Sequence, residues 1–186
     1  MNLNKDELRK HYLGVRKNQD NKQRQLKDNA IFLNAISYLM KHQAYKKIGI
    51  YYSIQDEVDT LKLIEWLIKN EYQVYLNKIL DKKHRLMQFS RIYDLDFDKE
   101  NIYKNIIQPK NNEFSNNELD IIFIPLVAYD NNHHRIGMGY GYYDNYLKNT
   151  KTIKVGLAYK LQETDCINKE VHDVQLDLII NEDGIR

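Results

Sequence analysis

Apolar residues near the start of the chain recur at helical spacing, which predicts two successive helices. Leu8, Tyr12 and Val15 lie along one face of the first helix, behind Asn4 and Glu7, a pair that resembles a capping box. A second helix is expected to run to about residue 42, with an apolar face made of Leu26, Ala30, Leu33 and Met40.

The remaining apolar segments are short, which is typical of strands, and the segment from Leu86 to Phe89 is predicted from its alternation of apolar and polar residues. They lie at 47–52, 74–76, 86–89, 121–124, 153–158 and 178–180, and Pro125 ends the fourth. Between the first two, Thr60 is expected to cap a helix that carries Leu61, Ile64, Leu67 and Ile68. Residues 94–119 are polar and rich in asparagine, so we expect a loop with short elements there. A further helix is expected from Tyr142 to about Lys148.

Strands that alternate with helices indicate the α/β class. We therefore expect residues 1–186 to form a single layered domain with a mainly parallel central sheet flanked by helices. Ligands of such sheets tend to bind beyond the carboxyl ends of the strands.

One segment departs from these patterns, because glycine occupies every second position. It reads Arg135-Ile136-Gly137-Met138-Gly139-Tyr140-Gly141-Tyr142-Tyr143-Asp144. A backbone free of side chains can turn its amides towards phosphate oxygens, next to an arginine and a carboxylate. The segment is neither a Walker loop nor the dinucleotide fingerprint. From spacing alone, a phosphate-binding loop and a flexible turn whose tyrosines merely pack both stay open.

Composition narrows the class of protein. The chain has 186 residues and a formal charge of +2, so nothing in its charge favours nucleic acid or an anionic membrane. No stretch approaches the roughly 18 apolar residues of a membrane span, and the start lacks a secretory signal. Cys166 is the only cysteine, which excludes an intrachain disulfide. We expect a cytoplasmic protein, and a monomer, since no exposed apolar stripe is predicted.

The glycine-rich segment resembles the signature of the 5-formyltetrahydrofolate cyclo-ligases (5,10-methenyltetrahydrofolate synthetases), with Ile136 in place of the usual leucine. Other segments resemble that family in the same order along nearly the whole chain. They are Lys5-Asp6-Glu7-Leu8-Arg9, Tyr52 to Thr60, Ile124 to Asp130, Val155 to Tyr159 with Gln162, and His172-Asp173-Val174 with Asp177.

The resemblance implies an enzyme that converts 5-formyltetrahydrofolate and ATP into 5,10-methenyltetrahydrofolate, ADP and phosphate. The formyl oxygen is a poor leaving group, so it is first phosphorylated by ATP and then displaced when N10 closes the ring. Such phosphoryl transfer depends on positioning and charge neutralisation more than on a protein nucleophile. The implied cofactors are ATP and Mg²⁺, and the preferred length of a folate polyglutamate tail stays open.

The resemblance also assigns roles to individual residues. Catalysis falls to Arg135 and Tyr142, and the magnesium ligands are Asp144 and Asp173. ATP binding falls to Lys5, Arg9, Arg135, Ile136, Gly137, Met138, Gly139, Tyr140, Gly141, Tyr142 and Tyr143. The folate would be bound by Tyr52, Glu57, Gly139, Tyr140, Gly141 and Tyr142.

The chain departs from the family pattern at Asn77, Gln108, Leu126 and Asn181, which affects the middle loops and the outer folate pocket. Two alternatives remain. One is an ATP-dependent kinase or ligase for another small heterocycle, which Glu57 and the first-helix motif oppose. The other is a non-catalytic module that binds nucleotide or RNA, which the near-neutral charge opposes.

Overall fold

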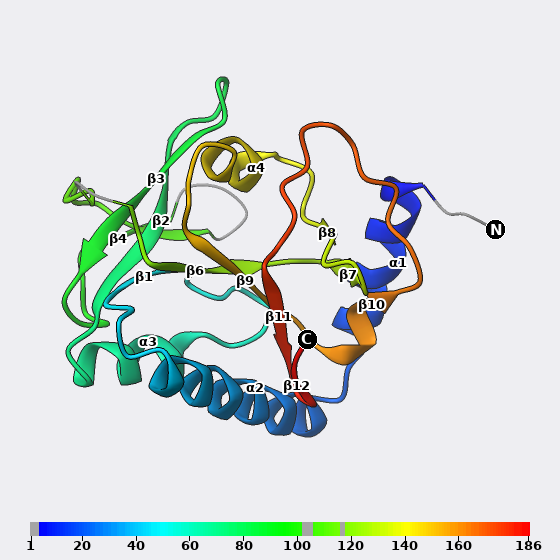
Figure 1. Cartoon of the computed structure of the whole chain (residues 1–186), viewed down its shortest axis with the longest axis horizontal. Coiled ribbons are helices and arrows are strands. Elements are labelled where there is room, and N and C mark those ends of the chain that lie inside the picture. Colours follow the sequence, from blue (N-terminus) through cyan, green and yellow to red (C-terminus); the bar gives the residue numbers. More distant parts are fainter. Residues whose placement is uncertain (1–3, 102–105, 116–117) are drawn as a thin grey trace.

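The structure of the protein, a computed structural model, describes residues 4–101, 106–115 and 118–186. A seven-stranded sheet of order β12-β11-β9-β6-β1-β2-β3 forms its centre (Figure 1). These strands are β1 (Lys47–Ile50), β2 (Gln73–Asp81), β3 (Leu86–Ile92), β6 (Ile121–Pro125), β9 (Ile153–Leu157), β11 (Leu178–Asn181) and β12 (Gly184–Ile185).

The central strands are parallel. β1 pairs in parallel with β2 and β6, and β9 pairs in parallel with β6 and β11. Only the edge strands β3 and β12 are antiparallel to their neighbours. The predicted α/β class with a mainly parallel sheet is therefore confirmed.

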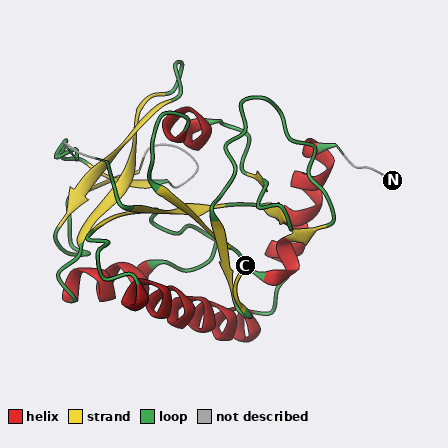
Figure 2. Ribbon diagram, in the orientation of Figure 1, coloured by secondary structure: helices red, strands yellow, loops and turns green. Residues whose placement is uncertain are grey.

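Helices cover both faces of the sheet (Figure 2). α2 (Asn21–Lys41) and α3 (Leu61–Lys69) lie on one face, and the short α4 (Tyr142–Leu147) lies on the other. α1 (Lys5–Lys17) stands at one end of the molecule, beside a small sheet of order β10-β7-β8 and the turn η1 (Lys160–Gln162). That small sheet is formed by β7 (Ala128–Asp130), β8 (Arg135–Ile136) and β10 (Glu163–Thr164). A separate hairpin joins β4 (Lys99–Asn101) to β5 (Ile107–Pro109).

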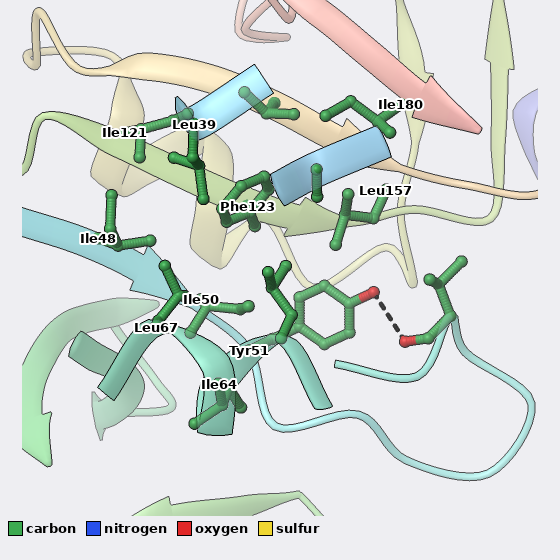
Figure 3. Close-up of a cluster of buried hydrophobic side chains, with 14 of the residues drawn as sticks. Leu39, Ile48, Ile50, Tyr51, Ile64, Leu67, Ile121, Phe123, Leu157 and Ile180 are labelled. Atoms are coloured by element: carbon green, nitrogen blue, oxygen red, sulfur yellow. Dashed lines mark hydrogen bonds between the residues drawn. The ribbon is translucent and has the colours of Figure 1, made fainter. Parts of the chain in front are cut away.

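The larger hydrophobic cluster lies between the sheet and the two helices α2 and α3 (Figure 3). Leu39 of α2 and Leu67 of α3 pack there against Ile48, Ile50 and Phe123 of the central strands. Each of these side chains is buried, so each contributes about 1.5–3 kcal/mol of transfer free energy to folding. This packing holds the carboxyl ends of β1 and β6 in fixed positions.

The predicted capping box is confirmed, since the Asn4 side chain accepts from the amides of Asp6 and Glu7, and Glu7 Oε2 accepts from the Asn4 amide at 2.8 Å. Thr60 precedes α3 as expected, but its side chain does not cap the helix. The Thr60 hydroxyl donates instead to the Tyr51 carbonyl at 2.7 Å. Asp59 Oδ1 accepts from the first amide of α3, that of Leu61.

The second helix forms as predicted and ends beside His42, but the predicted apolar face is wrong. Leu26, Leu33 and Met40 are each more than half exposed. The helix instead buries a neighbouring stripe made of Ile31, Ala35, Tyr38 and Leu39. Both stripes have helical spacing, and the sheet surface packs against only one of them.

The chain reverses its direction of winding at the centre of the sheet. From β1 it proceeds to β2 and β3 on one side, then returns to β6 on the other side and continues to β9 and β11. The carboxyl ends of β1 and β6 therefore border a crevice of the kind that binds ligands in open α/β sheets. Among the helices that the structure describes, none is both long and apolar enough to cross a membrane.

Candidate functional site

A cavity of about 1670 Å³ opens at this crevice. It is bordered by Tyr51 and Tyr52, which follow β1, and by Pro125 and Leu126 at the end of β6. Every residue that the sequence predicts for the site lines it: Lys5, Arg9, Tyr52, Glu57, Arg135, Ile136, Gly137, Met138, Gly139, Tyr140, Gly141, Tyr142, Tyr143, Asp144 and Asp173. Segments far apart in the sequence thus meet in one cavity.

The glycine loop adopts a backbone that requires glycine at two positions. Gly139 and Gly141 have φ angles of 86° and 70°, which side-chain-bearing residues rarely adopt. Arg9 of α1 donates from Nε to the Gly137 carbonyl at 2.8 Å. A Cβ on Gly139 would lie 3.3 Å from the Arg9 guanidinium carbon, so glycine also allows this close approach. α1 and the loop therefore form one wall of the cavity.

Arg135 and Asp144, at the two ends of the glycine segment, form an ion pair. Arg135 Nη2 lies 2.7 Å from Asp144 Oδ1, and the side chain of Arg135 is buried. Arg135 Nη1 also donates to the Val174 carbonyl, and Asp144 Oδ1 accepts from the Val174 amide at 3.1 Å. The loop is thereby joined to the chain segment that contains Asp173.

Lys5 and Asp173 form a second ion pair across the cavity, although 168 residues separate them. Lys5 Nζ lies 2.5 Å from Asp173 Oδ2 and 3.2 Å from Glu170 Oε1. Burial acts to raise the pKa of Asp173, but the Glu170 amide and the Lys5 ammonium outweigh it and hold the pKa below its ordinary value. Asp173 is therefore a carboxylate at neutral pH.

Asp144 and Asp173 fit the role of magnesium ligands in number and chemistry. Magnesium in ATP-using sites usually takes one or two carboxylates, with phosphates and water as its other ligands. Within the described part of the chain, Asp144 uses only Oδ1 in hydrogen bonds, and Asp173 uses only Oδ2. Asp144 thus keeps Oδ2 outside these hydrogen bonds, and Asp173 keeps Oδ1, which lies 4.0 Å from His172 Nε2. No cluster of three or more His, Cys, Asp or Glu side chains able to hold a metal occurs among these residues.

Glu57 occupies the part of the cavity that follows β1. Its Oε2 accepts from the Ile54 amide at 3.1 Å. Burial raises the pKa of Glu57 to about 7, against the lowering effects of that hydrogen bond and of Arg16. A carboxyl with this pKa changes charge near neutral pH, which makes it a candidate for a functional group.

The loop that carries Glu57 is held from the opposite side by a buried network. The Tyr159 hydroxyl donates to Asp28 Oδ1 at 2.6 Å and lies 3.3 Å from the Glu57 carbonyl oxygen. Asp28 Oδ1 also accepts from the Asp59 amide at 3.1 Å. Asp28 of α2 and Tyr159, which follows β9, therefore hold the backbone of the loop that carries Glu57.

The aromatic residues of the cavity differ in their surroundings. Tyr52 packs edge-to-face against Phe97, with ring centroids 6.1 Å apart, and its half-buried ring lines the cavity. The ring of Tyr142 is likewise half-buried. The Tyr143 hydroxyl is buried and has no hydrogen-bond partner within the described residues, and burial raises its pKa. Such an unpaired buried hydroxyl is uncommon in folded proteins and can be satisfied by a ligand.

Sequence reasoning missed several lining residues. Arg16 is buried, pairs with Asp56 at 2.8 Å and donates to the Leu126 carbonyl at 3.2 Å. Its position seven residues after Arg9 placed it on the same helical face, a signal that was available. Arg85 and Lys148 also line the cavity, but no local pattern marks them.

Comparisons with known proteins agree with this geometry. A family model described as the 5-formyltetrahydrofolate cyclo-ligase family matches residues 2–182. The 5-formyltetrahydrofolate cyclo-ligase of Haemophilus influenzae is 34% identical, over 97% of this chain and 100% of that protein. That of Mycoplasma genitalium is 32% identical, over 96% of this chain and 98% of its own.

Two solved structures have the same fold. The 5,10-methenyltetrahydrofolate synthetase of Aquifex aeolicus matches with a TM-score of 0.84 and 30% identity, over 98% of this chain and 91% of that chain. The synthetase of Mycoplasma pneumoniae matches with a TM-score of 0.80 and 28% identity, over 97% of this chain and 99% of that chain. The chain described here belongs to the 5-formyltetrahydrofolate cyclo-ligase family.

Proposed function

We propose that this protein converts 5-formyltetrahydrofolate into 5,10-methenyltetrahydrofolate, using ATP and Mg²⁺ and releasing ADP and phosphate. The observation that carries the proposal is that Lys5, Arg9, the glycine loop and Glu57 line one cavity. Groups suited to phosphate and a carboxyl suited to a pterin therefore border the same cavity, where ATP and a folate could bind side by side. Family membership favours this reaction over the chemistry of another heterocycle or a pure binding module.

Positively charged side chains and backbone amides would hold the triphosphate. Lys5 and Arg9 approach from α1, and Arg135 approaches from the base of the glycine loop. Arginine presents a fork of donors that matches phosphate oxygens. A magnesium ion bound by Asp144 and Asp173 would neutralise further charge on the phosphates.

Glu57 and Tyr52 would orient the folate. A carboxylate can accept paired hydrogen bonds from the amino group and ring nitrogen of a pterin, and an aromatic ring can pack on its flat face. The formyl oxygen would then attack the γ-phosphorus of ATP, and ADP would leave. N10 would next attack the formyl carbon, the C–O bond to phosphate would break, and N10 would lose its proton. In this proposal Arg135 and Tyr142 would stabilise the charge that develops on the transferring group.

The test is a spectrophotometric assay for methenyltetrahydrofolate, with 5-formyltetrahydrofolate, ATP and Mg²⁺ each omitted in turn. We expect product only when all three are present. Arg135→Ala should lower kcat by about 100-fold or more, as the loss of a transition-state donor does in other enzymes. Glu57→Ala should mainly raise the KM for the folate, with ATP binding retained.

Glu65 provides a matched control for Glu57, because it is an exposed carboxyl on α3. Glu65→Ala should leave both KM values unchanged. A folded wild-type protein that forms no product would contradict the proposed reaction, and the same nucleotide site would then have to serve a different acceptor.

A further inference from the structure

The tip of the hairpin between β2 and β3 carries positive charge that the proposed reaction does not use. Its residues are Lys82, Lys83, His84 and Arg85, and the last two line the cavity. Arg85 has a φ of 54°, a left-handed conformation that is uncommon for residues other than glycine, asparagine and aspartate. The tip therefore holds Arg85 in a specific backbone conformation at the cavity.

The side chain of Asn145 contacts both the backbone of Arg85 and the ammonium group of Lys148. Asn145 of α4 donates from Nδ2 to the Arg85 carbonyl at 3.0 Å, and its Oδ1 accepts from Lys148 Nζ at 2.8 Å. The Arg85 guanidinium lies against the glycine loop, since a Cβ on Gly141 would be 3.2 Å from Arg85 Nη1. Both cations thus border the cavity from the hairpin and from α4.

Among the described residues, these two cations lack an acidic partner, in contrast to the cations assigned to the phosphates of ATP. Lys5 and Arg135 each pair with a carboxylate. Within the part of the chain that the structure describes, neither Arg85 nor Lys148 has one, and Asp81 pairs with His84 instead, at 2.7 Å. Two unneutralised cations that border one cavity are stabilised by an anion. The chemistry of the pair therefore favours a carboxylate or phosphate ligand.

The side from which these cations approach the cavity favours the carboxylate. The tip of the β2–β3 hairpin, which carries Arg85, stands above α4 in Figure 1, whereas α1, which supplies Lys5 and Arg9, stands at the right of that view. Apolar side chains of Ile79, Met87 and Ile107 line the cavity on the hairpin side. 5-Formyltetrahydrofolate has a flat aminobenzoyl group between its pterin and its glutamate, and this apolar lining suits such a group.

We propose that Arg85 and Lys148 bind the glutamate carboxylates of the folate substrate. This inference rests on the proposed function, because it requires a folate whose pterin lies near Glu57. The pair would anchor the anionic end of the substrate and leave the phosphates of ATP to α1 and the glycine loop.

The test compares two ligands by titration calorimetry and by turnover. One is 5-formyltetrahydrofolate, and the other is its pteroyl methylamide analogue, which keeps N10 and the aminobenzoyl ring but carries no carboxylate. Arg85→Asn removes the charge, and asparagine tolerates the left-handed conformation. We expect this variant to bind the folate about five- to tenfold more weakly, the loss typical of one exposed charge-assisted contact, with affinity for the methylamide and KM for ATP unchanged.

Lys83→Asn is the matched control, since it removes the same charge from the same hairpin at a residue outside the cavity lining. It should leave all the constants unchanged, and Arg85→Lys should restore part of the folate affinity. Equal losses for both ligands, or a raised KM for ATP, would overturn the proposal. A wild-type protein that binds folate more tightly than the methylamide but forms no product would contradict the proposed reaction and leave the carboxylate site standing.

Discussion

Glu57 lies in surroundings that oppose its negative charge, and this has a measurable cost for stability. Its pKa is about 7 in the folded protein and 4.5 as a model side chain. The folded state therefore binds an extra proton between these values, and the free energy of unfolding falls as the pH rises through them. The shift corresponds to about 3 kcal/mol, fully lost above pH 7.

We expect Glu57→Gln to be more stable than the wild type at pH 8, by up to about 3 kcal/mol, and equally stable at pH 4. Urea unfolding across this range measures the difference. Glu65→Gln, at an exposed carboxyl on α3, should show no such dependence on pH. A difference that stays constant with pH would mean that the Glu57 charge is not the cause. A difference that grows with pH, together with a loss of folate affinity in the variant, would show that this position gives up stability for ligand binding.

At the scale of single residues, sequence alone identified the local motifs well. The glycine loop could be recognised because its chemistry lies within ten adjacent residues, from Arg135 to Asp144. The pairing of Lys5 with Asp173 could not, because it depends on how the two ends of the chain meet. The same holds for Arg85, whose place beside Gly141 follows from the packing of a hairpin against α4.

The central strand β1 packs so closely against its neighbours that it requires glycine. A Cβ on Gly49 would lie 2.8 Å from Leu119 Cδ1, 2.9 Å from Ile122 Cγ1 and 3.0 Å from Phe89 Cε1, and all three side chains are buried. We expect Gly49→Ala to lower the free energy of unfolding by about 1–3 kcal/mol through overpacking. Chemical denaturation measures this value directly.

Gly14, inside α1, provides the opposite case. A Cβ there meets nothing within 4 Å, and the residue lies inside a helix. Gly14→Ala should therefore raise stability by about 0.5–1 kcal/mol. If both substitutions changed stability in the same direction, the packing explanation for Gly49 would fail.

At the scale of elements, sequence predicted which helices and strands exist better than it predicted what they contact. The parallel strands were found because their apolar runs are continuous. The buried side of α2 was assigned wrongly because Leu26, Leu33 and Met40 repeat as regularly as the side chains that face the sheet. The short hairpin of β7 and β8 was not predicted, since its few residues carry no periodic signal.

The exposed stripe on α2 bears on the state of the whole molecule. The expectation of a monomer rested on the absence of an exposed apolar stripe, and Leu26, Leu33 and Met40 form one. That reason therefore fails, although the monomer itself stays a prediction.

At the scale of the whole molecule, the cavity joins two ion pairs, in which two cations expected to bind phosphate are paired with the two carboxylates expected to bind the metal. ATP alone must compete with Asp144 and Asp173 for Lys5 and Arg135. A metal offers the displaced carboxylates a new partner. We therefore expect Mg²⁺ to raise the affinity for ATP about tenfold or more, a usual size for coupling between sites.

Asp173→Asn tests this coupling by calorimetry with and without a chelator. The variant removes the nearer of the two carboxylates that pair with Lys5 and leaves Glu170, so it should bind metal-free ATP more tightly than the wild type and gain less from Mg²⁺. Asp165→Asn, at an exposed position outside the cavity lining, should behave as the wild type does. An unchanged effect of Mg²⁺ in Asp173→Asn would show that the internal pair does not oppose ATP.

The contact between Lys5 and Asp173 also has a consequence for the order in which parts of the protein fold during synthesis. The two residues are separated by 168 positions, so the contact closes a loop that includes nearly the whole chain. A growing polypeptide exposes its amino-terminal part first, and long-range contacts form only after their loops can close. The wall of the cavity that contains α1 is therefore complete only after the segment around Asp173 has been synthesised. A nascent or truncated chain that lacks this segment would have the glycine loop without a finished site.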